Sequence, residues 1–370
     1  MRVLHVISTI NRGGAENHLA DLAIGQASRG LEVKVAFLKG DGYWSTRLHA
    51  AGVQTEPLDL AYYGAITPIF RLRRLMSDWG PDLVHAHMPP AELYTRLALL
   101  GSGSRPPLVI TKHNDEPFYH GPFHRALGRW VARRALRLIV ISDAIRSYMR
   151  IQMHISDERM RTVHYGIDCR LFENVESQSR RQLRAKWGVA EGDMVIGTIA
   201  RLVPQKALHI LLQAVARYQA MTPTKTRLVV VGHGPLLEDL EKLSDRLGLL
   251  DTVLWFGFRE DIPALMNAFD VFSLTSVYEG FGLVFLEAMA ASRPVVATNV
   301  SAVGEIVQNE ETGLLCPVDA IEAIAAAFLR MENSELRTRL GRNGHVRARK
   351  CFSLERMLDA TFAVYRECAP

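Results

Sequence analysis

The stretch RVLHVISTINRGGAENHLADLAIGQASRGLEVKVAFL, residues 2–38, decides the fold class. It begins with a short run rich in Val, Ile and Leu (2–8), continues with a segment of helical spacing (11–30), and ends in a second apolar run (32–38). A strand, a helix and a strand in this order form a parallel pair joined by a helical crossover. The stretch therefore predicts an α/β protein with helices on both faces of a parallel sheet.

The same alternation continues along the 370 residues, which is more than one core usually supports. It restarts after about residue 170, so we predict two doubly wound, Rossmann-like domains in series: 1–172 and 173–350. The polar helical segment 177–193 is interpreted as a linker and lead-in. Residues 351–370 are expected to form a C-terminal helix that packs back toward the N-terminal domain. Ligands of such folds bind beyond the carboxyl ends of the strands, which predicts a cleft between two facing domains. Further strand-like runs lie at 82–87, 107–113, 137–142, 194–200, 227–232, 253–257, 271–275, 293–298 and 313–317.

The composition is that of an ordinary globular protein, with 48% hydrophobic residues. No run of about 18 apolar residues predicts a membrane span. The first residues, MRVLHVIS, favour a buried strand over a signal peptide. The four cysteines form no C-x-x-C pair and no zinc-like cluster with histidine, which favours reduced thiols in the cytoplasm.

The net charge of +5 is unevenly distributed, since residues 1–172 carry 22 Lys and Arg against 15 Asp and Glu. Basic residues interleave with apolar ones at 69–75 and 123–140. Two interpretations stay open. These stretches dock on an anionic membrane carrying a lipid-linked acceptor, or they are helices with one solvated face. We expect no nucleic-acid partner.

Several loops carry residues suited to a phosphorylated ligand. Gly13 and Gly14 lie between a strand and a helix, where the backbone and the helix N-terminus can approach an anion. Arg201 and Lys206 follow a strand and suit a diphosphate, although solvated loop charges have the same pattern. Gly232-His233-Gly234 begins like a dinucleotide fingerprint, but Leu237 occupies the third glycine position, so we expect Gly232 to shape a turn.

Glu279 and Glu287 lie eight positions apart in VYEGFGLVFLEAMA, residues 277–290. The glycines at 280 and 282 predict a helix that begins near Gly282, with Glu279 in the loop before it. The two carboxylates therefore do not share a helix face, and this spacing does not imply a paired acid and base. Loop 279–283 can offer backbone N–H groups to a phosphate or a sugar.

Three histidines, His85, His87 and His113, lie at the ends of two N-terminal strands, where they are either site residues or structural ones. No D-x-D motif is present, so a metal-chelated diphosphate lacks its usual acidic pair. We expect no metal site and no cofactor.

Six segments together resemble glycosyltransferase family 4, which comprises retaining enzymes of the GT-B fold. The most specific element is the E-x7-E pair, Glu279 and Glu287, which lies in one of these segments. The order and spacing of the segments hold over nearly the whole chain. In addition, HYGID (164–168) is similar to the segment before the family's domain crossover. The segments are GGAE (13–16), GTIARLVPQK (197–206), GHGP (232–235), EGFGLVFLEAMA (279–290), RPVVAT (293–298) and TGLL (312–315).

The resemblance implies a nucleotide-sugar donor, with a UDP-sugar favoured over a GDP-sugar, held mainly by the C-terminal domain. Arg201 and Lys206 would grip the diphosphate, and Glu287 would bind the ribose. Gly14 would lie by the donor phosphate, and His113, or more weakly His87, near the sugar. The donor sugar would be held by Glu279 with the backbone of Gly280, Phe281, Gly282 and Leu283.

The resemblance also implies a metal-independent, same-face transfer to a glycan or lipid-linked acceptor in cell-surface polysaccharide synthesis. The enzyme would be cytoplasmic, or peripheral at the inner face of the cell membrane. The alternatives are a non-catalytic nucleotide-sugar-binding subunit, a GT-B epimerase and an inverting transferase. The chain departs from the family where glycine usually follows the lysine, at Ala207, and where Ser301 and Ala302 replace a Gly-Gly pair.

Overall fold

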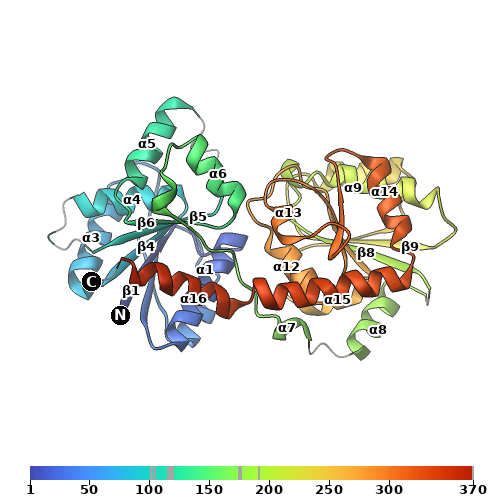
Figure 1. Ribbon diagram of the computed structural model, residues 1–370, viewed down its shortest axis with the longest axis horizontal. Helices are drawn as coiled ribbons and strands as arrows, with labels where there is room; N and C mark the ends of the chain where they lie inside the picture. Colours follow the sequence, from blue (N-terminus) through green and yellow to red (C-terminus); the bar gives the residue numbers. More distant parts are fainter. Residues whose placement is uncertain (101–102, 104–105, 115–120, 174–176, 191, 369–370) are drawn as a thin grey trace. The chain divides into compact units, whose positions relative to one another are not determined.

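The computed structural model shows two compact units, each built on its own parallel sheet (Figure 1). It describes residues 1–370 except 101–102, 104–105, 115–120, 174–176, 191 and 369–370. Unit 1 comprises Met1–Gly166 together with Leu354–Pro370, and unit 2 comprises Ile167–Ser353.

Unit 1 contains a seven-stranded sheet in the order β3-β2-β1-β4-β5-β6-β7, and all of its pairings are parallel. The central strands β4 and β5 are buried along their whole length, as expected for a sheet covered on both faces. The strands are β1 (Arg2–Ile7), β2 (Glu32–Phe37), β3 (Gln54–Pro57), β4 (Leu83–His87), β5 (Leu108–Lys112), β6 (Arg137–Val140) and β7 (Met160–Thr162).

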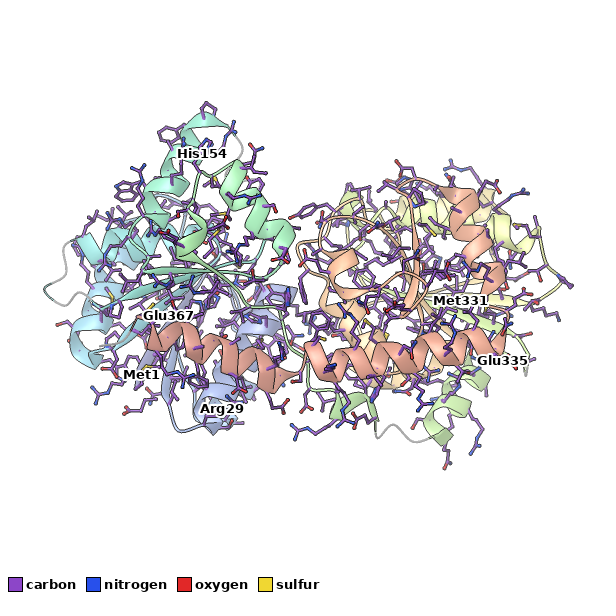
Figure 2. The ribbon with its side chains drawn as sticks, viewed as in Figure 1. Met1, Arg29, His154, Met331, Glu335 and Glu367 are labelled. Atoms are coloured by element: carbon purple, nitrogen blue, oxygen red, sulfur yellow. The ribbon has the colours of Figure 1, made fainter. Side chains whose placement is uncertain are left out.

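The C-terminal helix α16 packs into unit 1 although it is last in the sequence (Figure 1). Its buried Met357 and Tyr365 share one core cluster with Val3 of β1 and Leu22 of α1. Charged contacts border this helix, and Figure 2 labels two of the residues involved, Arg29 and Glu367. Arg29 donates to Asp359 (2.6 Å), and the carboxylate of Glu367 accepts from Arg137 (2.6 Å) and Arg161 (2.8 Å). The helices of unit 1 are α1 (Gly14–Ser28), α2 (Ser45–Ala50), α3 (Thr67–Trp79), α4 (Pro89–Leu100), α5 (Pro122–Ala132), α6 (Asp143–Ile151), the 3₁₀ turn η2 (Asp157–Arg159) and α16 (Leu354–Arg366).

Unit 2 repeats this architecture with six parallel strands in the order β10-β9-β8-β11-β12-β13. All six lie where apolar runs predict strands. They are β8 (Met194–Ile199), β9 (Thr226–Val231), β10 (Val253–Phe256), β11 (Val271–Leu274), β12 (Val295–Thr298) and β13 (Gly313–Cys316).

The segment 177–193 is not a linker, because its helix α8 packs within unit 2. Arg180 and Arg184 each donate to the carboxylate of Asp270, at 2.7 and 2.8 Å, and the ring of Trp187 stacks on Phe269. The helices of unit 2 are α7 (Arg170–Glu173), α8 (Ser177–Lys186), the 3₁₀ turn η3 (Pro204–Lys206), α9 (Leu208–Gln219), α10 (Leu237–Arg246), α11 (Ile262–Ala268), α12 (Leu283–Ala290), α13 (Val303–Ile306), α14 (Ile321–Arg330) and α15 (Ser334–Cys351).

Two strands of unit 1 escape prediction from the sequence. β3 (QTEP) and β7 (MRT) lie at the two edges of the sheet and have no apolar run. Edge strands have one unpaired side and tolerate polar residues, so the hydrophobic pattern does not mark them.

Within the part of the chain that the structure describes, no helix is both long and apolar enough to cross a membrane.

Candidate functional site

In unit 2, the candidate residues gather at the carboxyl ends of β8 and β11. The Lys206 ammonium donates to the Glu279 carboxylate at 2.5 Å, and the Ser276 hydroxyl donates to the same oxygen at 2.6 Å. Glu279 is 4% exposed, so its carboxylate has little access to water and depends on these two protein partners for its hydrogen bonds. The sequence places a cation and a carboxylate on separate loops, and the structure joins them into one ion pair, in which Glu279 is buried and Lys206 is partly buried.

Hydrogen bonds connect the loops that carry this pair. The side-chain amide of Gln205 donates to the backbone carbonyl of Tyr278 (2.9 Å), and the hydroxyl of Thr275 donates to the backbone carbonyl of Ala207 (3.0 Å). The hydroxyl of Thr298, at the end of β12, donates to the carbonyl of Ser276 (2.5 Å). Lys206 and Glu279 are therefore held in place before any ligand binds.

The loop after Glu279 leads into helix α12, which begins at Leu283 as the glycines predict. Gly282 has φ 94°, a left-handed conformation that favours glycine. The Phe281 side chain is buried and packs edge-on against Phe352, which anchors the turn. Glu287 lies in the second turn of α12 and is partly exposed. The two glutamates thus lie on different elements, one buried in the loop and one on the helix.

Gly232 and Gly234 bring the loop after β9 against the loop that carries Arg201. A Cβ at Gly232 would lie 1.9 Å from the carbonyl oxygen of Ala200, and one at Gly234 would lie 2.3 Å from that of Leu202. The Leu202 amide donates to the His233 carbonyl at 3.0 Å. These glycines are needed for close backbone packing, which explains the GHG motif without a dinucleotide.

Arg201 itself is exposed, and no ion pair or side-chain hydrogen bond to its guanidinium is found among the described residues.

The two departures from the family pattern fall on strained backbone. Ala207, at the start of α9, has φ 43°, and Ser301 also has φ 43°. A left-handed conformation costs a residue with a Cβ roughly 1 kcal/mol relative to glycine. The structure therefore gives a physical reason for glycine at both positions.

In unit 1, Gly13 precedes the first residue of α1 and Gly14 begins the helix. A Cβ at Gly14 would meet no atom within 4 Å, so the N-terminus of this helix has open space beside it. The Glu16 carboxylate accepts from the Thr9 hydroxyl at 2.9 Å, which ties the first turn of α1 to the end of β1.

Four histidines of unit 1, His5, His85, His87 and His113, belong to one buried hydrogen-bonded chain. Strand register places His5 beside His85 and Ile7 beside His87, so the three imidazoles share one face of the sheet. His87 Nδ1 lies 3.0 Å from His113 Nε2, and His113 Nδ1 lies 2.5 Å from the Tyr165 hydroxyl. His113 is 8% exposed, and both of its ring nitrogens have protein partners. Sequence reasoning treats these histidines singly and does not show that they are connected.

Burial keeps these imidazoles neutral. Desolvation lowers the pKa of His5 to about 4, against a smaller raising effect of its hydrogen bond to Gln26. Desolvation, with the nearby Lys112 ammonium, lowers the pKa of His113 to about 3. The pKa values of His18, His85 and His87 are lowered well below 6.5, first by burial and then by neighbouring histidines.

His5, His85 and His87 are also close enough together to hold a metal ion. However, every ring nitrogen of the three already has a protein hydrogen-bond partner. A metal would have to displace these partners, so the donor set fits a hydrogen-bonded chain better than a metal centre.

Site residues that the sequence did not single out are Ser276, Gln26, His5, His18, Tyr165 and Tyr365. His18 is buried and its ring stacks on Tyr165 at 4.1 Å between centroids. Tyr165 lies inside the HYGID segment, which was the one available signal. The others are ordinary polar residues of a strand, of helices and, for Ser276, of the loop after β11, so only the tertiary contacts identify them.

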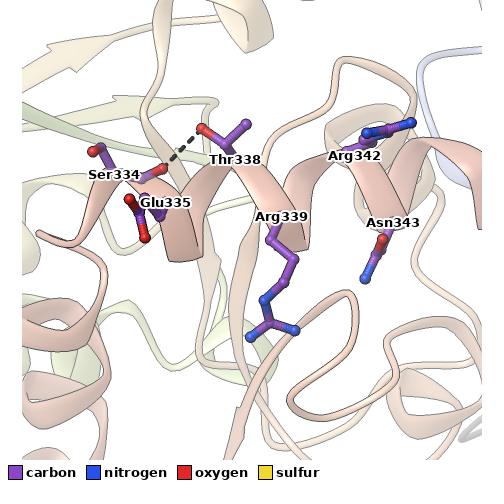
Figure 3. A pocket seen from close by; sticks show the side chains of 6 residues that line it. All are labelled: Ser334, Glu335, Thr338, Arg339, Arg342 and Asn343. Carbon is purple, nitrogen blue, oxygen red and sulfur yellow. Dashed lines mark hydrogen bonds between the residues drawn. The ribbon is translucent and has the colours of Figure 1, made fainter.

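A shallow hollow lies on the exposed side of helix α15 (Figure 3). Its lining comes from this one helix, and the Thr338 hydroxyl donates to the Ser334 carbonyl within it (2.8 Å). None of the candidate residues lines this hollow, so we do not assign it to the functional site.

Two family models match the chain. "Glycosyltransferase Family 4" matches residues 12–171, and "Glycosyl transferases group 1" matches residues 179–347. Together they cover both units.

Known proteins agree with these matches. The chain is 29% identical over 323 residues to the alpha-D-kanosaminyltransferase of Streptomyces kanamyceticus, covering 82% of each chain. It is 32% identical over 301 residues to the D-inositol 3-phosphate glycosyltransferase of Saccharomonospora viridis, covering 78% of this chain and 65% of the relative. Among solved structures, Anabaena Alr3699/HepE in complex with UDP and glucose is similar with a TM-score of 0.88 and 26% identity, covering 99% of this chain and 100% of HepE.

Proposed function

We propose, given that this chain belongs to glycosyltransferase family 4 with the GT-B fold, that it is a retaining hexosyl- or N-acetylhexosaminyltransferase. Glycosyltransferases of this type use nucleotide-sugar donors, and we propose a UDP-sugar for this chain. The HepE structure with UDP and glucose supports this choice of nucleotide. The acceptor is proposed to be a glycan or a lipid-linked sugar in cell-surface polysaccharide synthesis.

The observation that carries the proposal is the ion pair of the partly buried Lys206 with the buried Glu279, beside a helix that begins after Gly282. Glu279 offers a fixed carboxylate for sugar hydroxyls, and its orientation is set by Lys206 and Ser276. The Lys206 ammonium and the exposed Arg201 guanidinium supply positive charge for a diphosphate. Glu287 on α12 would bind the ribose hydroxyls, with backbone from Gly280 to Leu283 between the two glutamates. Gly232 would support the loop that carries Arg201 by its packing against Ala200.

The chemistry that suits these groups is charge stabilisation. When the bond between the sugar and the diphosphate breaks, negative charge develops on the leaving phosphate and positive charge on the sugar. Arg201 and Lys206 would stabilise the leaving group where its charge develops. The acceptor hydroxyl would attack from the same face and pass its proton to a phosphate oxygen, so no protein base and no metal is required. From unit 1, Gly13 and Gly14 would contact the phosphate, and His113 would lie near the sugar.

Helices α3 and α5 support a peripheral membrane contact. On α5, Phe123 is 73% exposed and is followed by Arg125 and Arg129. On α3, Phe70 is 57% exposed next to the basic Arg71. Exposed aromatic rings beside cations suit the surface of an anionic bilayer, which would also present a lipid-linked acceptor. We propose docking at the inner face of the cell membrane.

The donor assignment is tested with the purified protein and a panel of nucleotide sugars. We expect turnover with a UDP-sugar and, by NMR of the product, retention of the anomeric configuration. Arg201→Ala and Lys206→Ala should each lower kcat by about 10²-fold. Arg217→Ala, which removes an exposed arginine of α9 that is paired with Glu322 of α14, is the matched control and should leave kcat unchanged. Wild-type rates in both site variants would refute the diphosphate assignment.

Glu287→Ala separates binding from chemistry. We expect it to weaken donor affinity in calorimetry more than it lowers kcat at saturating donor. An unchanged affinity with a lost chemical step would instead make Glu287 a catalytic group.

The membrane proposal is tested by flotation with liposomes. The protein should float with vesicles that contain anionic phospholipid and stay at the bottom with neutral ones, and a Phe70→Ser, Phe123→Ser double variant should lose the binding. Absence of binding to anionic vesicles at low salt would refute the proposal.

A further inference from the structure

A continuous chain of buried hydrogen bonds runs through unit 1 from the C-terminal helix α16, past the end of strand β5, to Tyr165 in the segment after β7. At one end, the Gln26 amide lies between Tyr365 and His5: its Nε2 is 3.0 Å from the Tyr365 hydroxyl and its Oε1 is 2.8 Å from His5 Nε2. From there the links are His5 Nδ1 to His87 Nε2 (3.0 Å), His87 Nδ1 to His113 Nε2 (3.0 Å) and His113 Nδ1 to the Tyr165 hydroxyl (2.5 Å).

A branch leaves the chain at Tyr365. The tyrosine hydroxyl lies 2.7 Å from His85 Nδ1, and His85 Nε2 lies 2.7 Å from the Thr111 hydroxyl. Every ring nitrogen of His5, His85, His87 and His113 therefore has one partner. All four rings are neutral, so each has one N–H donor and one acceptor nitrogen.

These constraints give the chain a single direction. The Gln26 carbonyl oxygen can only accept, so His5 must donate from Nε2 and accept at Nδ1. His87 must then donate from Nε2 to His5, and His113 from Nε2 to His87. The Tyr165 hydroxyl consequently donates to His113 Nδ1. On the branch, Gln26 Nε2 donates to Tyr365, whose hydroxyl donates to His85 Nδ1.

One ring cannot change tautomer alone. If His87 carried its proton on Nδ1, that N–H would face the N–H of His113, and two lone pairs would face each other at His5. An unsatisfied buried polar group is costly in a dry interior. The tautomer of His113 is therefore coupled to the orientation of an amide three hydrogen bonds away.

We infer that Gln26 and Tyr365 are positioning residues, which hold His113 as the Nε2–H tautomer with its ring fixed against Tyr165. The inference rests on the proposed function in one respect, which is that His113 lies near the donor sugar. In this arrangement Tyr365 of the C-terminal helix, which is far from His113 in the sequence, takes part in organising the site. Gln26 and Tyr365 are both buried, so we assign them no contact with substrate.

The test is the tautomer of each ring, read from long-range ¹⁵N–¹H correlation spectra of protein labelled at histidine. In the wild type, His5, His85, His87 and His113 should all show the Nε2–H pattern. In Gln26→Glu, the carboxylate accepts from both His5 and Tyr365. His5, His87 and His113 should therefore keep their tautomer, while His85 switches to Nδ1–H, because Tyr365 now donates to Glu and must accept from His85.

Activity supplies the second readout. Gln26→Leu removes the group that orients His5, so His113 should show mixed tautomers. We expect kcat/KM for the sugar donor to fall by about tenfold or more, while affinity for UDP alone, held by unit 2, stays unchanged. Gln26→Glu should restore kcat/KM to near the wild-type value. Tyr218→Phe is the control, since it removes a buried hydroxyl that donates to Glu332 in unit 2 and should change neither readout.

Different tautomers at His5 and His113 in the wild type would overturn the inference, as would wild-type His113 signals and kcat/KM in Gln26→Leu. If Gln26→Leu does not fold, the inference is decided by the histidine tautomers in the spectra of the wild type and of Gln26→Glu. Stoichiometric binding of added Zn²⁺ with loss of the Nε2–H pattern would also overturn it, because His5, His85 and His87 would then be ligands. Failure of the proposed function is seen separately, as absence of turnover in the wild type, and leaves the spectra to test the chain.

Discussion

Mild acid should destabilise unit 1 and spare unit 2. The perturbation is a change from pH 7 to pH 5, below the ordinary histidine pKa of about 6.5 and above the carboxylate range. The buried imidazoles with lowered pKa values all lie in unit 1. In the described part of unit 2, each histidine is at least partly exposed.

The sign follows from proton binding. The native pKa of His5 is about 4 and that of His113 about 3, so between these values and 6.5 the unfolded chain binds more protons than the folded one. Unit 1 therefore has its full stability, as far as these histidines are concerned, above pH 6.5, and it loses stability as the pH falls below this value. At pH 5 each of these two histidines lowers the free energy of unfolding of unit 1 by about 2 kcal/mol relative to pH 7. Together they remove about 4 kcal/mol, and the other three buried histidines act in the same direction.

A loss of about 4 kcal/mol corresponds to a fall of roughly 10 °C in the melting temperature of a unit of this size. Calorimetry at the two pH values should show one transition moving and one staying. Hydrogen exchange with mass spectrometry assigns them, since peptides of β1, β4 and β5 should lose protection relative to those of β8 and β9. The carboxylate of Asp270 in unit 2, whose pKa is lowered by Arg184 and Arg180 although burial opposes this, stays charged at pH 5. Equal losses in both units, or a loss in unit 1 below about 1 kcal/mol, would refute the reasoning.

Four further perturbations test the site. Ala207→Gly and Ser301→Gly should each raise the melting temperature of unit 2 by about 2–4 °C, because glycine relieves roughly 1 kcal/mol at φ 43°; unchanged melting by calorimetry would mean that these loops relax without strain. Gly232→Ala should lower the same transition and abolish UDP binding in calorimetry, since its Cβ would lie 1.9 Å from the Ala200 carbonyl oxygen; wild-type binding would show that the β9 loop can move away. Transfer should continue after treatment with EDTA and gel filtration, and a complete loss that Mg²⁺ or Mn²⁺ restores would contradict the metal-independent mechanism.

The local pattern of the sequence predicts much of the fold. Apolar runs mark all six strands of unit 2 and five of the seven in unit 1, because strands buried on both faces must be apolar. The glycines at 280 and 282 predict where α12 begins and so separate Glu279 from Glu287. The edge strands β3 and β7 escape prediction because an edge does not need a hydrophobic face. The helix α8 was misjudged as a linker because its packing depends on arginines that bind Asp270, some ninety residues away.

The sequence by itself determines the chemical types of the site: glycine turns, two cations, two glutamates and strand-end histidines. Their partners are decided only by the tertiary structure. The Lys206–Glu279 pair joins loops 73 residues apart, and the contact of Tyr365 with His85 joins residues 280 apart. The physical reason is that parallel sheets bring strand ends together from distant parts of the chain, whereas sequence patterns report only neighbours along it. Burial then makes each of these polar contacts obligatory, because a polar group without a partner is costly away from water.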